Sequence, residues 1–194
     1  MEIEKHPFPP FIPDEPRALV MGTFPPQPKR WAMDFYYPNR NNDFWKVCGI
    51  IFYSNPLRLY NPDTKQYDLP EIQAMLRRYH IAMSDTGVEA VRLAGNASDK
   101  FLDIRKPIDI DHFLNTYPTL QYLVTTGEKA AQIIAELTHT EPPKMGEYTE
   151  FEYESQPGTV RKVRHYRMPS TSRAYPLALE KKAALYARVF DLLK

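Results

Sequence analysis

Residues 33–47, MDFYYPNRNNDFWKV, gather the side chains best suited to binding a ligand. The aromatic rings could stack on a flat molecule, and the asparagine amides can both donate and accept hydrogen bonds. An apolar helical pattern begins at Phe44, so the amides precede a helix N-terminus, where free N–H groups favour an anion. These features suit a nucleobase, a nucleotide or another planar polar ligand. A purely structural role, with the rings in the core and the amides in loops and caps, is the commoner one for such residues and remains an alternative.

Three other loops carry groups that could join this site. Gly22-Thr23-Phe24-Pro25-Pro26 follows an apolar run, and its glycine lets the backbone approach a ligand, although a simple strand end explains it equally well. Asp85, with residues 95–99 (GNASD) further on, could polarise a water, although an aspartate there is more often a turn or cap residue. Residues 167–173, RMPSTSR, place hydroxyls beside cations, which suits a phosphate.

Several kinds of enzyme site are missing from the sequence. The five histidines have no metal-binding spacing, and neither a phosphate-binding P-loop nor a dinucleotide fingerprint occurs. Cys48 is the only cysteine and lies in an apolar pattern, so the chain cannot form an internal disulfide or a thiolate-held cluster. We therefore expect no metal and no cofactor.

Composition sets the broad class. The 194 residues carry a formal charge of +1, so any surface for nucleic acid must be local. No apolar run reaches the ~18 residues of a membrane span, and the acidic, proline-rich start differs from a signal peptide. We expect a cytoplasmic monomer without a membrane partner. Residues 1–16 hold five prolines and predict an extended arm, followed by a single domain over residues 17–194.

Hydrophobic periodicity predicts strands that alternate with helices. The predicted strands are residues 17–22, 81–86 and 120–124, and a hairpin over residues 149–168 that turns at Gln156-Pro157-Gly158. The predicted helices begin at residue 42 or 43 and run to 53, and then cover residues 70–79, 112–116 and 176–193. Asp109 or Asp111 is the predicted cap of the helix over residues 112–116. A further helix is predicted from a capping box at Thr125 and Glu128 to Leu137. Residues 103–110 are expected to form a loop.

This alternation predicts an α/β fold, in which a parallel sheet is covered by helices on both faces. Ligands bind such sheets beyond the carboxyl ends of the strands. We therefore expect the loops after Gly22, Thr86, Val124 and Met168 to line one cleft.

Taken in order, these loops resemble the uracil-DNA glycosylase superfamily, most closely its hypoxanthine-DNA glycosylase branch and more distantly the mismatch-specific enzymes. Gly22-Thr23-Phe24-Pro25 is similar to the Gly-x-x-Pro loop after the first strand. Tyr36-Tyr37 leading to Asn41-Asn42-Asp43-Phe44-Trp45 is similar to an aromatic pair followed by Arg-Asn-x-Phe-Trp. Met168-Pro169-Ser170-Thr171-Ser172 looks like Leu-Pro-Ser-Thr-Ser, and residues 82–101 also resemble the middle of that branch. The resemblance spans residues 17–175.

The resemblance implies a three-layer α/β/α sandwich with a short central parallel sheet. It also implies DNA base-excision repair by hydrolysis of the N-glycosidic bond of a deaminated base, uracil or hypoxanthine. The base would leave the stack at a cost of about a few kcal/mol, and a positioned polar group would hold the attacking water. Asn42 would position this water, with Asn39 and Asp43 as substitutes. The implied base-binding residues are Gly22, Thr23, Phe24, Pro25, Tyr36, Tyr37 and Thr126. The implied DNA-binding residues are Pro169, Ser170, Thr171, Ser172 and Arg173.

Departures from the superfamily favour an alternative, a member that binds DNA or a nucleotide without cleaving it. Thr23 and Phe24 stand where the uracil enzymes have Gln and a catalytic Asp, and Met168 stands where they have a catalytic His. A third hypothesis, a small-molecule enzyme on a similar scaffold, would have a closed pocket without a basic rim. The DNA-binding hypotheses need cations on the face of the cleft. The candidates are Arg30, Arg40, Lys46 and Arg173.

Overall fold

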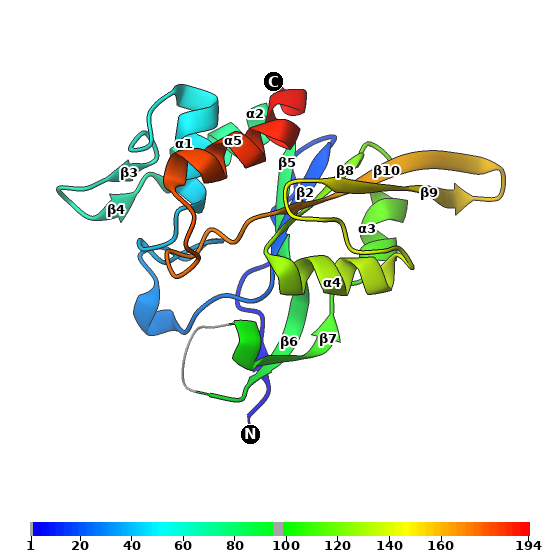
Figure 1. Ribbon diagram of the computed structural model, residues 1–194, viewed down its shortest axis with the longest axis horizontal. Coiled ribbons are helices and arrows are strands. Elements are labelled where there is room, and N and C mark those ends of the chain that lie inside the picture. Colours follow the sequence, from blue (N-terminus) through cyan, green and yellow to red (C-terminus); the bar gives the residue numbers. More distant parts are fainter. Residues whose placement is uncertain (1, 95–98) are drawn as a thin grey trace.

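Four parallel strands form the centre of the computed structural model, which describes residues 2–94 and 99–194. They are β2 (Ala18–Gly22), β5 (Ile81–Asp85), β8 (Tyr122–Thr126) and β10 (Thr159–Met168), arranged in the order β5-β2-β8-β10 (Figure 1). β9 (Tyr148–Gln156) adds an antiparallel edge strand beside β10. β2 and β5 are buried along their whole length, as is usual for parallel strands covered on both faces. The three predicted strands and the predicted hairpin are confirmed.

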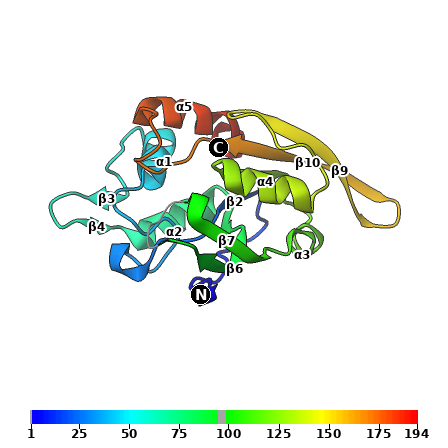
Figure 2. The same cartoon turned by 60° about the horizontal axis from the view of Figure 1, so that its bottom comes forward.

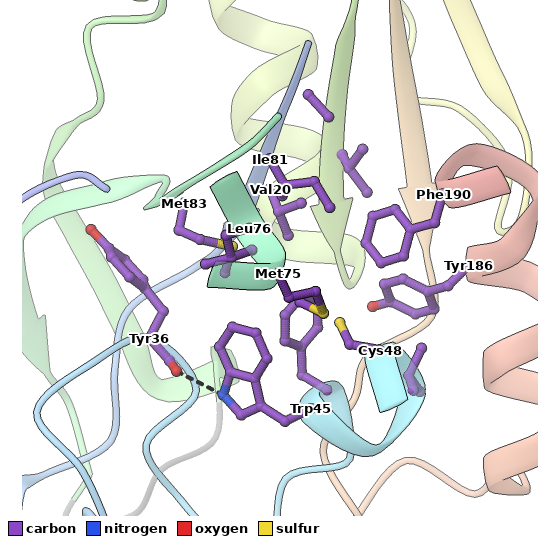
Figure 3. Close-up of a cluster of buried hydrophobic side chains, with 14 of the residues drawn as sticks. Val20, Tyr36, Trp45, Cys48, Met75, Leu76, Ile81, Met83, Tyr186 and Phe190 are labelled. Atoms are coloured by element: carbon purple, nitrogen blue, oxygen red, sulfur yellow. Dashed lines mark hydrogen bonds between the residues drawn. The ribbon is translucent and has the colours of Figure 1, made fainter. Parts of the chain in front are cut away.

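Helices cover both faces of this sheet, because alternate strand residues point to opposite sides. Val20 and Met83 pack on the side of α1 (Phe44–Tyr53), α2 (Leu69–Arg78) and α5 (Leu179–Phe190), where Figure 3 shows Met75, Tyr186 and Phe190 around them. Leu19 and Ala82 pack on the side of α3 (Ile110–Thr116) and α4 (Glu128–Leu137). Burying one such large apolar side chain contributes about 1.5–3 kcal/mol. The three-layer α/β/α arrangement that the sequence predicts is therefore present.

A second sheet lies at the carboxyl end of β5. β6 (Gly87–Arg92) follows β5 after one residue and pairs antiparallel with both β1 (Glu4–Lys5) and β7 (Leu102–Pro107). Phe11 forms a further antiparallel bridge with Met83, so the proline-rich arm lies along β5 and β6. The predicted loop over residues 103–110 is wrong. Pairing with β6, rather than apolar alternation, makes a strand of LDIRKP, whose last three residues are exposed.

The helix ends explain two further outcomes. Asp109 Oδ1 accepts the His112 N–H at 3.0 Å, which confirms the predicted cap of α3. The predicted capping box before α4 is wrong, because Gly127, at φ +114°, is the N-cap and Thr125 Oγ1 donates instead to the Tyr166 carbonyl oxygen at 3.0 Å. The last helix, α5, is shorter than predicted and continues only as a 3-10 turn, Asp191–Leu193.

Smaller elements complete the described chain. β3 (Tyr60–Asn61) and β4 (Gln66–Tyr67) form a hairpin at the end of the molecule opposite the β9–β10 hairpin (Figure 2). Two further 3-10 turns are Pro28–Arg30 and Asp99–Phe101. Within residues 2–94 and 99–194, no helix combines the length and the apolar character that crossing a membrane requires.

Candidate active site

The carboxyl ends of the parallel strands surround a cavity of about 170 Å³. Gly22 ends β2, Asp85 ends β5, Thr126 ends β8, and Ser170 follows β10 by two residues, and all four line the cavity. The prediction that these loops line one cleft is confirmed at these positions. An engineered cavity of about 150 Å³ binds benzene, so this one has room for a six-membered ring. Residues 95–98, which the sequence also nominated, lie outside the described part of the chain.

Polar groups converge on Gly22 at the floor of the cavity. The Gly22 N–H donates to Asp85 Oδ1 at 3.0 Å, and the Tyr37 hydroxyl and Thr126 Oγ1 are 2.7 Å apart. A Cβ on Gly22 would lie 2.9 Å from Asp85 Oδ1 and 3.2 Å from the Tyr37 hydroxyl oxygen. Only glycine therefore leaves room for these groups to meet.

Asp85 has a partner that sequence reasoning missed. His6 Nε2 lies 2.8 Å from Asp85 Oδ2, and both side chains are almost completely buried. The imidazole stacks on Tyr36 and meets Phe24 edge to face. His6 belongs to the proline-rich arm, far from Asp85 in sequence, and no spacing motif links the two residues.

The adjacent tyrosines have different roles. The Tyr37 ring stacks on Phe44 at 4.1 Å between centroids and lines the cavity, whereas Tyr36 is 2% exposed and donates to the carbonyl oxygen of Pro9 at 3.1 Å. Burial first, and then the charge of Asp85, raise the pKa of both phenols far above the ordinary value. Both hydroxyls therefore stay protonated. Phe24 adds a second ring to the cavity wall.

Two asparagines line the cavity with their oxygens already engaged. Asn42 Oδ1 accepts the N–H of Phe44, the first residue of α1, at 2.9 Å. Asn39 Oδ1 accepts the Asn41 N–H at 3.0 Å. Within residues 2–94 and 99–194, the amide NH₂ group of Asn42 has no hydrogen-bond partner and can act as a donor. Asp43 holds the N-cap position of α1, within the predicted choice of Asn or Asp, but its side chain makes no capping hydrogen bond.

Asp43 lies behind the cavity rather than in its lining. It forms ion pairs with Lys182 Nζ at 3.0 Å and with Arg173 Nε at 3.5 Å. Lys182 is 1% exposed and also donates to the Ser172 carbonyl oxygen at 3.0 Å, while the Asp43 N–H donates to the Thr171 carbonyl oxygen. These bonds fix the loop of residues 169–173, the hydroxyl loop, against the start of α1.

The hydroxyl loop lines the cavity from the other side. Ser170, Thr171 and Ser172 all contribute, together with Thr23 and Pro25 of the first loop. Pro169 lies just outside, and its carbonyl oxygen accepts the Tyr186 hydroxyl at 2.7 Å. Arg173, which is half exposed, does not join the lining.

Asp99 is a second carboxylate in the lining. Thr23 Oγ1 donates to Asp99 Oδ2 at 2.9 Å. Burial, with a smaller contribution from the charge of Asp85, raises the pKa of Asp99 above its usual range, although Thr23, Lys129 and Arg92 oppose the shift.

A wider groove of about 930 Å³ adjoins the cavity and shares Arg30, Asp99, Ser170 and Ser172 with it. Its cationic lining residues are Arg30, Lys100, Lys129 and Arg167. Of the four cations that the sequence nominated for this face, Arg30 lines both hollows, and Arg40, Lys46 and Arg173 line neither. In the part of the chain that the structure describes, no three His, Cys, Asp or Glu side chains are grouped so as to hold a metal ion.

Comparisons with known proteins support the fold. No protein-family model matches the sequence, and no curated protein matches it. A solved structure is similar over 99% of each chain, with a TM-score of 0.63 and 18% sequence identity. It is the solution NMR structure of a candidate uracil DNA glycosylase from Methanosarcina acetivorans. At this identity the similarity defines the fold, and the chain adopts a uracil-DNA glycosylase-like α/β fold with a central, mostly parallel sheet.

Proposed function

We propose that the protein is a DNA glycosylase that hydrolyses the N-glycosidic bond of a deaminated base, uracil or hypoxanthine. The observation that carries this proposal is the cavity of about 170 Å³, which has ring-bearing walls and a polar floor and opens beside a groove with four cations. A base taken out of the duplex needs such a pocket, with flat side chains to stack on and polar groups to read its edge. The strand that carries the base would follow the adjoining groove.

The lining residues divide by their chemistry. Phe24 and Tyr37 offer rings to the base, and Thr126 offers a hydroxyl. The NH₂ group of Asn42 would orient the attacking water, with Asn39 beside it. The remaining members of the proposed base pocket are Gly22, Thr23 and Pro25, with Tyr36 as support beneath them.

The DNA backbone would meet the hydroxyl loop and the groove. Ser170 and Ser172 line both hollows, so their hydroxyls lie where a phosphate beside the extruded base would pass. Arg167 and Lys129 supply positive charge in the groove. In this proposal Asp43 and Arg173 support the loop from behind. Residues 17–194 are one domain, and residues 1–16 are an arm that completes its site through His6.

A second function, binding of DNA or a nucleotide without cleavage, is favoured by one feature of the groove. Its four cations are accompanied by Asp99 and Glu128, and Lys129 already donates to the carbonyl oxygens of Asp99 and Leu102. The positive field available to a duplex is thereby reduced.

A base-release assay separates the two functions. Purified protein is incubated with labelled oligonucleotides that carry uracil or hypoxanthine, in single strands and opposite each normal base. Asn42→Asp keeps an oxygen for the Phe44 N–H but removes the NH₂ donor, and Asn41→Ala is the control because the Asn41 side chain is exposed and outside the cavity. We expect release by the wild type and Asn41→Ala, and a loss of about 10²-fold or more for Asn42→Asp, the usual scale for a group that orients a reactant. Salt-sensitive binding with no release from any substrate would favour the binding function.

A further inference from the structure

Two consecutive residues of the loop after β2 hold two carboxylates in the same cavity. The Gly22 N–H donates to Asp85 Oδ1 at 3.0 Å, and Thr23 Oγ1 donates to Asp99 Oδ2 at 2.9 Å. Asp85 and Asp99 come from different elements, the end of β5 and the 3-10 turn before β7, and both line the cavity. Their positions relative to each other are therefore fixed through one short segment of backbone.

The two carboxylates differ in their polar contacts. Asp85 Oδ1 accepts the Gly22 N–H and Asp85 Oδ2 lies against His6 Nε2, so both oxygens of Asp85 are held in place. The other groups close to Asp85 are the hydroxyls of Tyr36 and Tyr37, which stay protonated, and Asp99.

Asp99 has weaker support for a negative charge. Among the described residues, its side chain has one hydroxyl donor, Thr23, and the cations that act on it are Lys129 and Arg92. Burial and the neighbouring charge of Asp85 outweigh them and favour the neutral acid. Glycoside hydrolysis commonly uses two carboxyl groups, one as base and one as acid.

Asn42 cannot accept the proton of the attacking water, so the reaction needs a further group. Its amide oxygen already accepts the Phe44 N–H, so the group that it presents to the cavity is a donor. A donor can orient a water but cannot take its proton. The proton acceptor must then be a different lining group, and the Asp85 carboxylate, which lines the cavity and is held by Gly22 and His6, is suited to that task.

We propose that Asp85 is the catalytic base and Asp99 the catalytic acid of the hydrolysis, and that His6 positions Asp85. This inference rests on the proposed function. Water attacks the anomeric carbon of the sugar as the C–N bond breaks, and the water proton passes to Asp85. The electron pair of the broken bond stays with the base, which takes a proton from Asp99. The products are an abasic sugar and a neutral base, and exchange with solvent returns both carboxyl groups to their starting states.

The test is the pH dependence of the single-turnover rate of base release for the wild type, Asp85→Asn and Asp99→Asn. Asp103→Asn is the matched control, because Asp103 is partly exposed and pairs with Arg105 outside the cavity. The wild-type rate should fall at higher pH as Asp99, whose pKa is raised by burial, loses its proton. Asp85→Asn should be slower by about 10²–10⁴-fold, the range for general acid–base groups. Asp99→Asn should be slower by a similar factor and should lose the fall at higher pH.

A substrate comparison tests the acid separately from the fold. 5-Fluorouracil leaves more readily as an anion than uracil, so its release depends less on the acid. The factor by which Asp99→Asn slows release should therefore be at least tenfold smaller for 5-fluorouracil than for uracil. A structural defect would slow both substrates equally. Circular dichroism melts identify any variant that fails to fold, and Thr23→Ser, which keeps the hydroxyl on Asp99, should retain more activity than Thr23→Val.

The possible failures are distinguishable. In one outcome the wild type releases base, and Asp85→Asn or Asp99→Asn stays within threefold of its rate with an unchanged pH profile. That result overturns the acid–base pair and leaves the proposed function intact. Equal slowing of uracil and 5-fluorouracil release by Asp99→Asn overturns the acid role. A wild type that releases no base overturns the proposed function and this assignment together.

Discussion

His6 Nε2 lies 2.8 Å from Asp85 Oδ2, so the N-terminal arm contacts a carboxylate that lines the cavity. We predict that His6→Ala slows base release by about tenfold or more, because a hydrogen bond to a charged group is worth about 1.5–3 kcal/mol. His6→Gln, whose amide can donate, should recover most of the rate. Single-turnover rates and their pH profiles measure this effect, and His112→Gln, at an exposed histidine, is the control. Equal rates for His6→Ala and the wild type would contradict a positioning role.

The second prediction concerns Gly22. Gly22→Ala places a Cβ 2.9 Å from Asp85 Oδ1, so the carboxylate or the loop has to move and base release should fall by about 10²-fold, as is usual for a displacement of about 1 Å at a reacting centre. Gly158→Ala gives the opposite pattern. Gly158 has φ +82° at a hairpin turn, and a Cβ added there would meet no atom within 4 Å, so alanine there should lower the melting temperature and leave the rate unchanged. Wild-type rates for Gly22→Ala would remove the case for a crowded floor.

The sequence predicts the main sheet and its cleft because the central strands are short apolar runs that end in Gly, Asp or Thr. It does not predict the contact of His6 with Asp85. That contact depends on the path of the arm along β5 and β6, and no local pattern encodes it. The sequence does not predict the second sheet for the same reason, because β7 forms only by pairing with β6.

The adjacent tyrosines mark another limit. Tyr36 and Tyr37 look equivalent in sequence, but the positive φ of Tyr37, +51°, lets it turn to the cavity while Tyr36 enters the core. Asn42 and Asp43 separate in the same way. Asn42 faces the cavity, and Asp43 faces Lys182, a residue on a distant helix whose burial no charge pattern predicts.

Lys182 provides a stability prediction. Lys182→Met leaves the buried Asp43 carboxylate without its closest cation, and breaking a buried pair costs about 3–5 kcal/mol. The half-exposed Arg173 lies 3.5 Å from Asp43 and should reduce the loss to about 3 kcal/mol in the free energy of unfolding. The double variant Lys182→Met with Asp43→Leu removes both charges and should recover part of this loss. Denaturant unfolding of the wild type, both single variants and the double variant measures the coupling, and additive losses would argue against it.

His165 should make the protein less stable in mild acid. It is fully buried, its Nε2–H donates to Thr125 Oγ1 at 2.9 Å, and burial lowers its pKa from 6.5 to about 4. The unfolded chain takes up this proton below about pH 6.5, whereas the folded protein resists it until about pH 4. The stability attributable to neutral His165 is therefore complete above pH 6.5 and is lost as the pH falls from 6.5 to 4, by about 3 kcal/mol. Unfolding free energies across this range should flatten in His165→Asn, and an unchanged slope would contradict the prediction.

The groove gives the prediction that tests DNA binding most directly. Arg167 lines the groove and has one loose ionic partner, Glu128 at 3.8 Å, so its guanidinium can turn to a phosphate. Arg167→Gln should weaken binding of oligonucleotides uniformly across sequences and reduce the slope of log Kd against log salt by about 1. Arg105→Gln is the control, because Arg105 is half exposed, pairs with Asp103 and lies outside the groove. If both variants keep the wild-type slope, the DNA backbone does not contact Arg167, and the strand follows a different face of the protein.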